Sequence, residues 1–414
     1  MKLFGQEYLV DEESQKSELD PAALSYLESL VLPTSSEEDW RYGAIETLNF
    51  SKVRSINVVS DERDRELQAG AALWEDRLGQ SFDYVVGVVG SHVRVLRAGR
   101  RPEVTVGERE SSVTTCRSLA TEPFADIADL LSTRICEVRI ARGESALGEA
   151  PKIMIVGLAG DDSEVSTASV SVIVEAGARA MVAEVHVGGG DDAVHLSRTT
   201  VAVGAEGDLS LLTLQDLHDR STELGYLDIS VDRDGVFRSL HLALGSQYGR
   251  LRTQCDLVGE GAQAELLAGY LGGNHQTLEF RTFQNHDARN TKSNLLYKGA
   301  LAGASHAIYT GTIKVSKGAS GSTAFQTNRN LILGDDALAD SVPNLDIEEN
   351  DVKCSHASAV GPVDRDQVYY LESKGINGEK AERMIVGGSF RDLVSSAGYD
   401  PLRQVLEERL VVKW

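Results

Sequence analysis

The sequence predicts a mainly β protein in which a central part of many short strands lies between two segments with helical signals. Between residues 152 and 360, short β-branched runs alternate with glycine-containing turns, and the helical periodicity of the flanking segments disappears. The chain has 39 glycines and only 8 prolines, which favours tight turns between strands over disorder. These observations predict a parallel β-helix or a β-sandwich.

An apolar run followed by Gly-Ala recurs along this central part. The pair occurs at 177–178, 204–205, 261–262, 303–304 and 318–319. Gly303, Gly318 and Gly334 are almost evenly spaced, whereas the other gaps are wider and uneven. In a β-helix each coil would turn at a small residue, add a strand of about five residues and bury its apolar face on the next coil. A β-sandwich would also show many short strands, so both architectures stay open on periodicity.

The first 150 residues mix helix and strand signals and are expected to form an α/β domain. Asp20 before Pro21 is a cap residue before a favoured first helical position, so a helix should follow it. The remaining signals predict a helix over 60–78, strands over 84–96 with a turn at 90–91, a charged loop over 97–110, and a helix over 122–131.

The last residues, 361–414, predict a small helical domain after a β core at 151–360. A first helix begins after Asp364 or Asp366 and ends at Gly375, a second begins after Asn377 and ends near 387–388, and a third opens at 400–401. So small an appendage cannot bury its apolar stripes alone, and we expect it to pack on the β core or on a partner. The stripes are Val368 and Leu371 on the first helix, and Leu402, Val405 and Leu406 on the third.

The net charge of the chain bears on its partners, and its targeting signals bear on its location. The formal net charge of −22 repels phosphate backbones and anionic lipid, so we expect neither nucleic-acid nor membrane binding. The first residues, MKLFGQEYLVDEES, are acidic and lack the apolar stretch of a signal peptide, and no apolar run reaches the ~20 residues of a membrane span. We therefore expect a cytoplasmic protein.

Motifs of the common catalytic classes are missing from the sequence. There is no GxxxxGK[ST] phosphate loop, no GxGxxG after a strand, no GxSxG elbow and no HExxH zinc motif. The four cysteines form no CxxC pair, which excludes a zinc ribbon. We expect a chain that is not an enzyme by itself.

The segment DVKCSH at 351–356 is the strongest local candidate for a site. It reads as a strand, and the two-residue period of a strand puts Val352, Cys354 and His356 on one face. A thiolate and an imidazole on one face can bind iron or a soft divalent metal, or form a Cys–His pair with an activated thiol. A free cysteine is also commonly a small buried apolar residue, so a packing role stays open. The polar clusters around His286 and Gln326 instead suggest hydrogen-bonded ladders at turns.

The C-terminal half of the sequence, which contains this segment, resembles the SufB/SufD family of iron–sulfur cluster assembly proteins. The matching segments are HDARNT at 286–291, KGAL at 298–301, YTGTIKV at 309–315, QTNRNL at 326–331, PNLDIE at 343–348, DVKCSH at 351–356 and DQVYYLESKGI at 366–376. The likeness is dense over 285–395 and weaker upstream. Near the start, LPT at 32–34 and EDWRY at 38–42 resemble the SufD branch rather than the SufB branch, and the chain length suits SufD better.

This resemblance implies a right-handed parallel β-helix core between an N-terminal α/β domain and a C-terminal helical domain. It implies a scaffold subunit that pairs with a SufB-like subunit through the β-helix and docks a SufC-like ABC ATPase on the C-terminal helices. Cys354 and His356 would lie near the interface with the SufB-like subunit, where the nascent cluster forms. The family's cluster ligation is attributed chiefly to SufB, so we expect no stably bound cofactor here, and a transient iron–sulfur cluster at that interface.

Two other functions compete with this one. A β-helix enzyme acting on acidic polysaccharide would usually be secreted and need a basic groove with carboxylates, which an acidic chain without a signal does not favour. A homo-oligomeric structural solenoid, including a homodimer of the isolated chain, would pair the same surface with itself by two-fold symmetry.

Overall fold

A computed structural model describes most of the chain. The described residues are 2–3, 6–7, 25–26, 29–31, 33–43, 45, 48, 54–55, 61–110, 122–143, 149–396 and 401–413. Most of the helix predicted after Pro21 lies outside these residues. No helix in the described ranges is both long and apolar enough to cross a bilayer.

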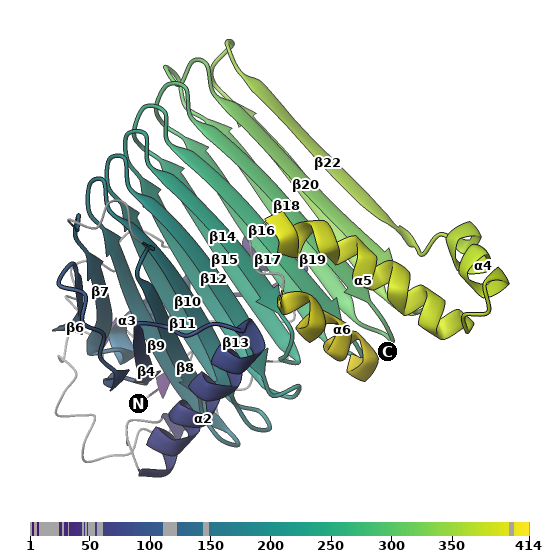
Figure 1. Ribbon diagram of the computed structural model, residues 1–414, viewed down its shortest axis with the longest axis horizontal. Coiled ribbons are helices and arrows are strands. Elements are labelled where there is room, and N and C mark those ends of the chain that lie inside the picture. The colour runs from purple at the N-terminus through teal and green to yellow at the C-terminus, as the bar shows by residue number, and fades with distance from the viewer. Residues whose placement is uncertain are drawn as a thin grey trace.

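Two facing sheets form the body of the molecule, and successive strands of the chain alternate between them (Figure 1). The strand order is β22-β20-β18-β16-β14-β12-β10-β8-β4-β5 in one sheet and β21-β19-β17-β15-β13-β11-β9-β7-β6 in the other, where β3 also pairs with β9. The strands are β1 (Lys2–Leu3), β2 (Gln6–Glu7), β3 (Arg54–Ser55), β4 (Tyr84–Val89), β5 (His92–Arg97), β6 (Val104–Glu110), β7 (Arg134–Ile140), β8 (Lys152–Ala159), β9 (Glu164–Val174), β10 (Arg179–Gly188), β11 (Val194–Val203), β12 (Asp208–Leu217), β13 (Thr222–Val231), β14 (Val236–Ala243), β15 (Tyr248–Leu257), β16 (Gln263–Gly272), β17 (Thr277–His286), β18 (Lys292–Leu301), β19 (His306–Val315), β20 (Thr323–Ile332), β21 (Leu338–Ile347) and β22 (Lys353–Pro362). The helices are η1 (Glu38–Trp40), α2 (Asp61–Leu78), α3 (Pro123–Leu131), α4 (Arg365–Ser373), α5 (Gly378–Ser396) and α6 (Leu402–Lys413).

The parallel β-helix is confirmed, and the β-sandwich is excluded. From β8 to β22, each strand pairs in parallel with the strand two places along the chain, as one coil stacks on the next. The coils differ in length, because Thr277 lies opposite His306, whereas Thr222 lies opposite Tyr248, which is nearer to it in the chain. A β-sandwich would instead pair its strands in antiparallel fashion.

The predicted strand length was wrong, and the glycine spacing explains why. Most strands of the core have 10 residues, not about five, because each coil contains only two strands. Gly303 lies in the turn from β18 to β19 and Gly318 in the turn from β19 to β20, at opposite edges of the solenoid. The even spacing of these glycines therefore corresponds to half a coil. Both glycines have positive φ (61° and 96°), a backbone conformation that favours glycine.

The N-terminal segment continues the two sheets. β4 pairs with β8 and β7 with β9 in parallel, whereas the hairpins β4–β5 and β6–β7 are antiparallel. The helices predicted at 60–78 and 122–131 and the strands at 84–96 are confirmed as α2, α3, β4 and β5. The loop predicted over 97–110 was partly wrong, because β6 occupies Val104–Glu110 and pairs with β7 along its whole length.

Helices cover the outer faces of both sheets. Helices α2, α5 and α6 lie across the sheet that contains β8 and β16 (Figure 1), and α3 covers the other sheet. The second C-terminal helix was predicted to end near 387–388, but α5 continues through both glycines to Ser396. Phe390 and Leu393 beyond them are buried against the sheet, and this packing offsets the low helix propensity of glycine.

Candidate functional site

The solenoid is capped by hairpins at its first end, whereas at its last end no described residue covers the edge strands. At the first end each sheet finishes in an antiparallel hairpin, with β5 and β6 as the outermost strands. At the last end β21 and β22 are parallel edge strands, each paired with one strand in the described part of the chain. The inward-facing side chains of this last coil stay accessible, as the exposed fractions of Leu345 (41%), Ile347 (37%) and Val360 (47%) show. An edge strand with unpaired backbone groups and apolar side chains is a natural surface for strand pairing with another chain. We call this surface, β21 and β22 with their inward-facing side chains, the open end.

Cys354 and His356 both lie at the open end, at the start of β22. Cys354 is opposite Ala324 of β20 and His356 is opposite Gln326, and both of these β20 residues are buried inside the solenoid. Since residues in register in a parallel pair share a face, Cys354 and His356 share the inward face, as the sequence predicted. Cys354 is half-buried beside Ala324, whereas His356 is exposed. Leu345 and Ile347, at the end of β21, lie on the other side of the turn that leads into β22.

The layer beneath His356 contains polar groups that have no partner in the described part of the chain. Neither the amide nitrogen nor the amide oxygen of buried Gln326 forms a hydrogen bond with a described residue, and the hydroxyl of Ser341 on β21 forms none either. A side chain at Gly311 would come within 2.6 Å of the Gln326 amide nitrogen, so glycine is needed there to make room. Buried polar groups are normally paired, so these atoms are available to a water or a ligand entering the open end.

The environment of Cys354 sets its chemistry. Burial raises the pKa of the Cys354 thiol, and the backbone N–H of Ala324 offsets this only in part. In the isolated chain the residue is therefore a thiol at neutral pH, and a poorer metal ligand than a thiolate. The exposed imidazole of His356 can bind a metal while neutral, so of the two residues it is the more available ligand.

The predicted ATPase-docking residues are mostly part of this chain's own core. Val368, Leu402, Val405 and Leu406 are buried, and Leu371 packs against the same cluster. The apolar stripes are thus covered within the chain, and they do not by themselves require a partner. The predicted helix start and end are confirmed, since the Asp364 carboxylate accepts a hydrogen bond from the backbone N–H of Asp366, and Gly375 has a φ of 85°.

A groove between α5 and α6 offers another docking surface. It has a volume of about 610 Å³. Met384 and Val411 contribute exposed apolar surface at the groove, where their exposed fractions are 49% and 60%. Basic side chains line the same groove, namely Lys380, Arg383, Arg391 and Arg403.

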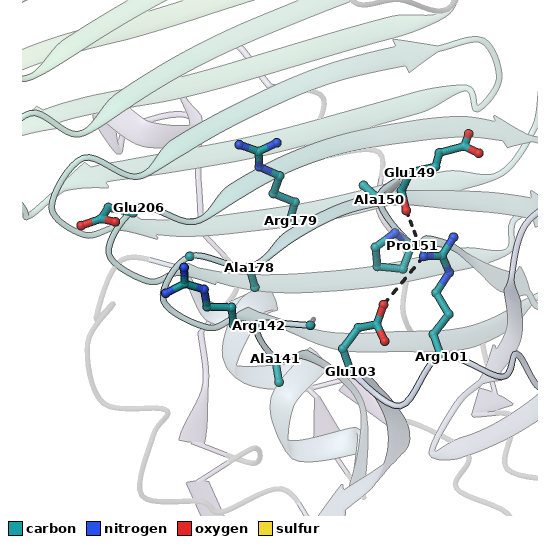
Figure 2. A pocket seen from close by; sticks show the side chains of 12 residues that line it. Arg101, Glu103, Ala141, Arg142, Glu149, Ala150, Pro151, Ala178, Arg179 and Glu206 are labelled. Atoms are coloured by element: carbon teal, nitrogen blue, oxygen red, sulfur yellow. Dashed lines mark hydrogen bonds and ion pairs between the residues drawn. The ribbon is translucent and has the colours of Figure 1, made fainter. Parts of the chain in front are cut away.

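A second hollow lies at the capped end, far along the strand order from β22. Figure 2 shows its charged lining, with Arg101 bonded to Glu103 and to the backbone of Glu149. The hollow measures about 310 Å³, and Arg142, Arg179 and Glu206 complete its charged groups. Acidic and basic groups alternate here, and the hollow contains neither of the predicted site residues.

The polar clusters noted in the sequence have structural roles, with one exception. The ring of buried His286 bonds to Thr291 (2.7 Å) and Ser293 (2.8 Å). Asn328 and Asn330 bond to each other and to the Tyr270 hydroxyl within the interior, in mid-strand rather than at a turn. Gln326 stays outside this network and forms part of the open end. Its sequence context, a run of amides, gave no signal that separates it from its neighbours.

Comparisons with known proteins agree with this architecture. A family model described as "SUF system FeS cluster assembly, SufBD core domain" matches residues 157–389. Over 409 residues the chain is 26% identical to the iron-sulfur cluster assembly protein SufD of Escherichia coli, covering 96% of this chain and 94% of that protein. It is 35% identical over 212 residues to a SufBD family protein of Mycobacterium leprae, and 33% identical over 253 residues to one of Mycobacterium tuberculosis. These two matches cover 49% and 59% of this chain, but only 54% and 63% of the relatives' own lengths.

Proposed function

Since the chain belongs to the SufBD family of iron–sulfur cluster assembly proteins, we propose that it is a non-catalytic, SufD-like scaffold subunit. It pairs with a SufB-like subunit through the open end, docks a SufC-like ATPase on its C-terminal helices, and works in the cytoplasm. A transient iron–sulfur cluster forms at the junction of the two scaffold subunits, with His356 as this chain's ligand and Cys354 beside it.

The observation that carries the proposal is the open end itself. A solenoid normally needs a capping element at each end, and the described residues supply hairpins at the first end but no such element at the last. A second β-helix placed on β21 and β22 would continue both sheets and cover Leu345, Ile347 and Val360. His356 and Cys354 would then lie inside the junction, together with the two amide atoms of Gln326 that form no hydrogen bond with a described residue. A second copy of this chain could pair with the same edge strands, β21 and β22. Such a homodimer is the alternative to pairing with a SufB-like subunit.

Charge substitution at the open end tests the pairing. Ile347→Asp places a carboxylate in the apolar surface that pairing would bury, and should abolish co-purification with the SufB-like subunit. Val95→Asp is the matched control, because Val95 is also an exposed β-branched strand residue (51%) but lies on β5 at the capped end. If both variants keep the partner at wild-type yield, the open end is not the interface. If the wild-type chain elutes only as a dimer of itself in the presence of the SufB-like subunit, the homo-oligomer is correct.

The groove between α5 and α6 supports the ATPase-docking proposal better than the buried stripes do. Deleting the C-terminal helices would uncover the apolar outer face of β16 and β18, so it is a poor test of docking. Met384→Asp alters an exposed side chain and should abolish binding of the SufC-like ATPase while the fold is kept. Val31→Asp, at an exposed valine in the N-terminal part, is the control. Equal ATPase binding by the wild type and Met384→Asp in a pull-down would contradict docking at this groove.

A further inference from the structure

A cluster of titratable side chains lies inside the solenoid, several coils away from the open end. His186 of β10, His195 of β11 and Glu223 of β13 each offer one ligand atom, and these three atoms lie within 4.8 Å of one another. His195 and Glu223 are direct register partners, so the parallel ladder itself brings them together. All three residues are buried.

His195 carries a polar atom that has no partner among the described residues. Its Nδ1 lies 2.8 Å from the Ser166 hydroxyl, whereas its Nε2 is buried and forms no hydrogen bond within the described ranges. When Nδ1–H donates to Ser166, the lone pair of Nε2 is left free to bind an electrophile. A neutral imidazole held in this way by a hydrogen bond on its other nitrogen is the usual state of a metal ligand.

The other two residues are also oriented by hydrogen bonds. His186 Nδ1 lies 2.5 Å from Glu223, and its Nε2 lies 3.1 Å from Glu184. The Ser197 hydroxyl donates to Glu223 at 3.0 Å. A ligating histidine whose second nitrogen donates to a carboxylate is a recurrent arrangement around protein-bound metals. Opposite His186, Gly157 leaves room for the ring, since a side chain there would come within 2.9 Å of it.

The charges of the cluster do not balance within the protein. Glu184 and Glu223 bring two carboxylates into the interior, and no lysine or arginine of the described residues forms an ion pair with either. His186 is the only side chain of the described residues that forms an ion pair with them, and one histidine can carry at most one positive charge. Burying an uncompensated charge is costly. A divalent cation bound between the two carboxylates would balance both of them, which an ion pair with His186 alone cannot do.

We propose that His186, His195 and Glu223 form a buried site for one divalent transition-metal ion, of the class that takes imidazole and carboxylate ligands, such as Zn²⁺ or Fe²⁺. Nitrogen and oxygen ligands of a tetrahedral zinc ion lie about 3.4 Å apart. Ligand atoms that lie within 4.8 Å of one another would therefore have to move closer by up to about 1.4 Å. Ser166, Ser197 and Glu184 are positioning residues. The role is structural or a reserve of metal, because all three ligands are buried.

Co²⁺ is a suitable probe, because its visible absorption reports on its ligands. The full chain, stripped of metal with a chelator, should bind one equivalent of Co²⁺ when the ion is present during refolding. Equimolar Zn²⁺ should displace Co²⁺ and abolish the visible absorption band. The melting temperature should rise with metal concentration, because a ligand that binds the native state and not the unfolded chain stabilises the native state. X-ray absorption of the Zn²⁺-loaded chain should show imidazole ligands. A wild-type chain with no stoichiometric Co²⁺ band, or with zinc bound without imidazole, would overturn the proposal whatever the variants do.

His195→Asn and Glu223→Gln should each weaken Co²⁺ binding at least tenfold, and Ser197→Ala should weaken it less. His241→Asn is the matched control, because His241 is also an interior histidine, half-buried and bonded to Thr213 at 2.9 Å, but it does not belong to the cluster. His356→Ala controls for adventitious binding at an exposed imidazole. If the His195→Asn variant folds and binds Co²⁺ as tightly as the wild type, the assignment is contradicted. The site is independent of the proposed scaffold function, since none of these measurements needs a partner protein.

Discussion

His356→Ala separates a role in cluster assembly from a role in folding. The residue lies on an edge strand, its side chain is exposed, and no hydrogen bond to it is found among the described residues. Substitutions of this kind usually change the free energy of unfolding by less than about 0.5 kcal/mol. We therefore expect the variant to fold and melt like the wild type, and to retain its partners.

The expected loss is in cluster formation by the assembled complex. Removing even a residue that only orients a metal ligand costs about 10–100-fold in affinity or activity. If His356 binds the nascent cluster directly, the yield of cluster per folded complex should fall at least about tenfold. The assay is reconstitution of the complex with iron, a sulfide source and ATP, followed by the iron–sulfur absorption and normalised to folded complex.

His286→Ala is the control with the opposite signature. His286 is buried and bonded to two hydroxyls, so its loss should destabilise the chain by roughly 1–3 kcal/mol. Cluster yield per folded complex should nevertheless equal that of the wild type. A wild-type yield from His356→Ala would remove His356 from the mechanism, and a large drop in its melting temperature would show that the residue is structural.

Two further predictions concern other parts of the chain. Arg250 is fully buried between Glu122 (3.2 Å) and Glu279 (3.1 Å). Arg250→Ala leaves the buried Glu279 carboxylate without its cation and Glu122 with Arg252 alone, so it should destabilise the chain by about 3–5 kcal/mol in urea denaturation. A loss under about 1 kcal/mol would refute that reasoning. Because burial raises the pKa of Cys354, its alkylation at neutral pH should be slower than in the unfolded chain and should speed up as pH rises past the usual cysteine range. Peptide mass spectrometry reads this residue alone, and a rate equal to that of the unfolded chain would show that the thiol is not shielded.

Local sequence signals predicted the elements that depend on local physics. The cap at Asp364, the C-terminal glycine at Gly375, helix α2 and the glycine-containing turns all follow from backbone preferences of a few residues. The two-residue period of a strand placed Cys354 and His356 on one face, which the register with β20 confirms. Where a local rule failed, long-range packing overrode it, as in α5, whose glycines stay helical because Phe390 and Leu393 are buried on the sheet.

The sequence by itself determined a β core of repeated turns, its flanking helices and the likeness to a scaffold family. Only the tertiary structure decided that the last coil is open, that the C-terminal stripes are covered by this chain's own sheet, and that His195 meets Glu223. The physical reason is register. Coils of unequal length occur in one solenoid, so no fixed spacing in the chain says which side chains will stack. That pairing is set by the hydrogen-bonded ladder of the whole sheet, which forms only when every coil is in place.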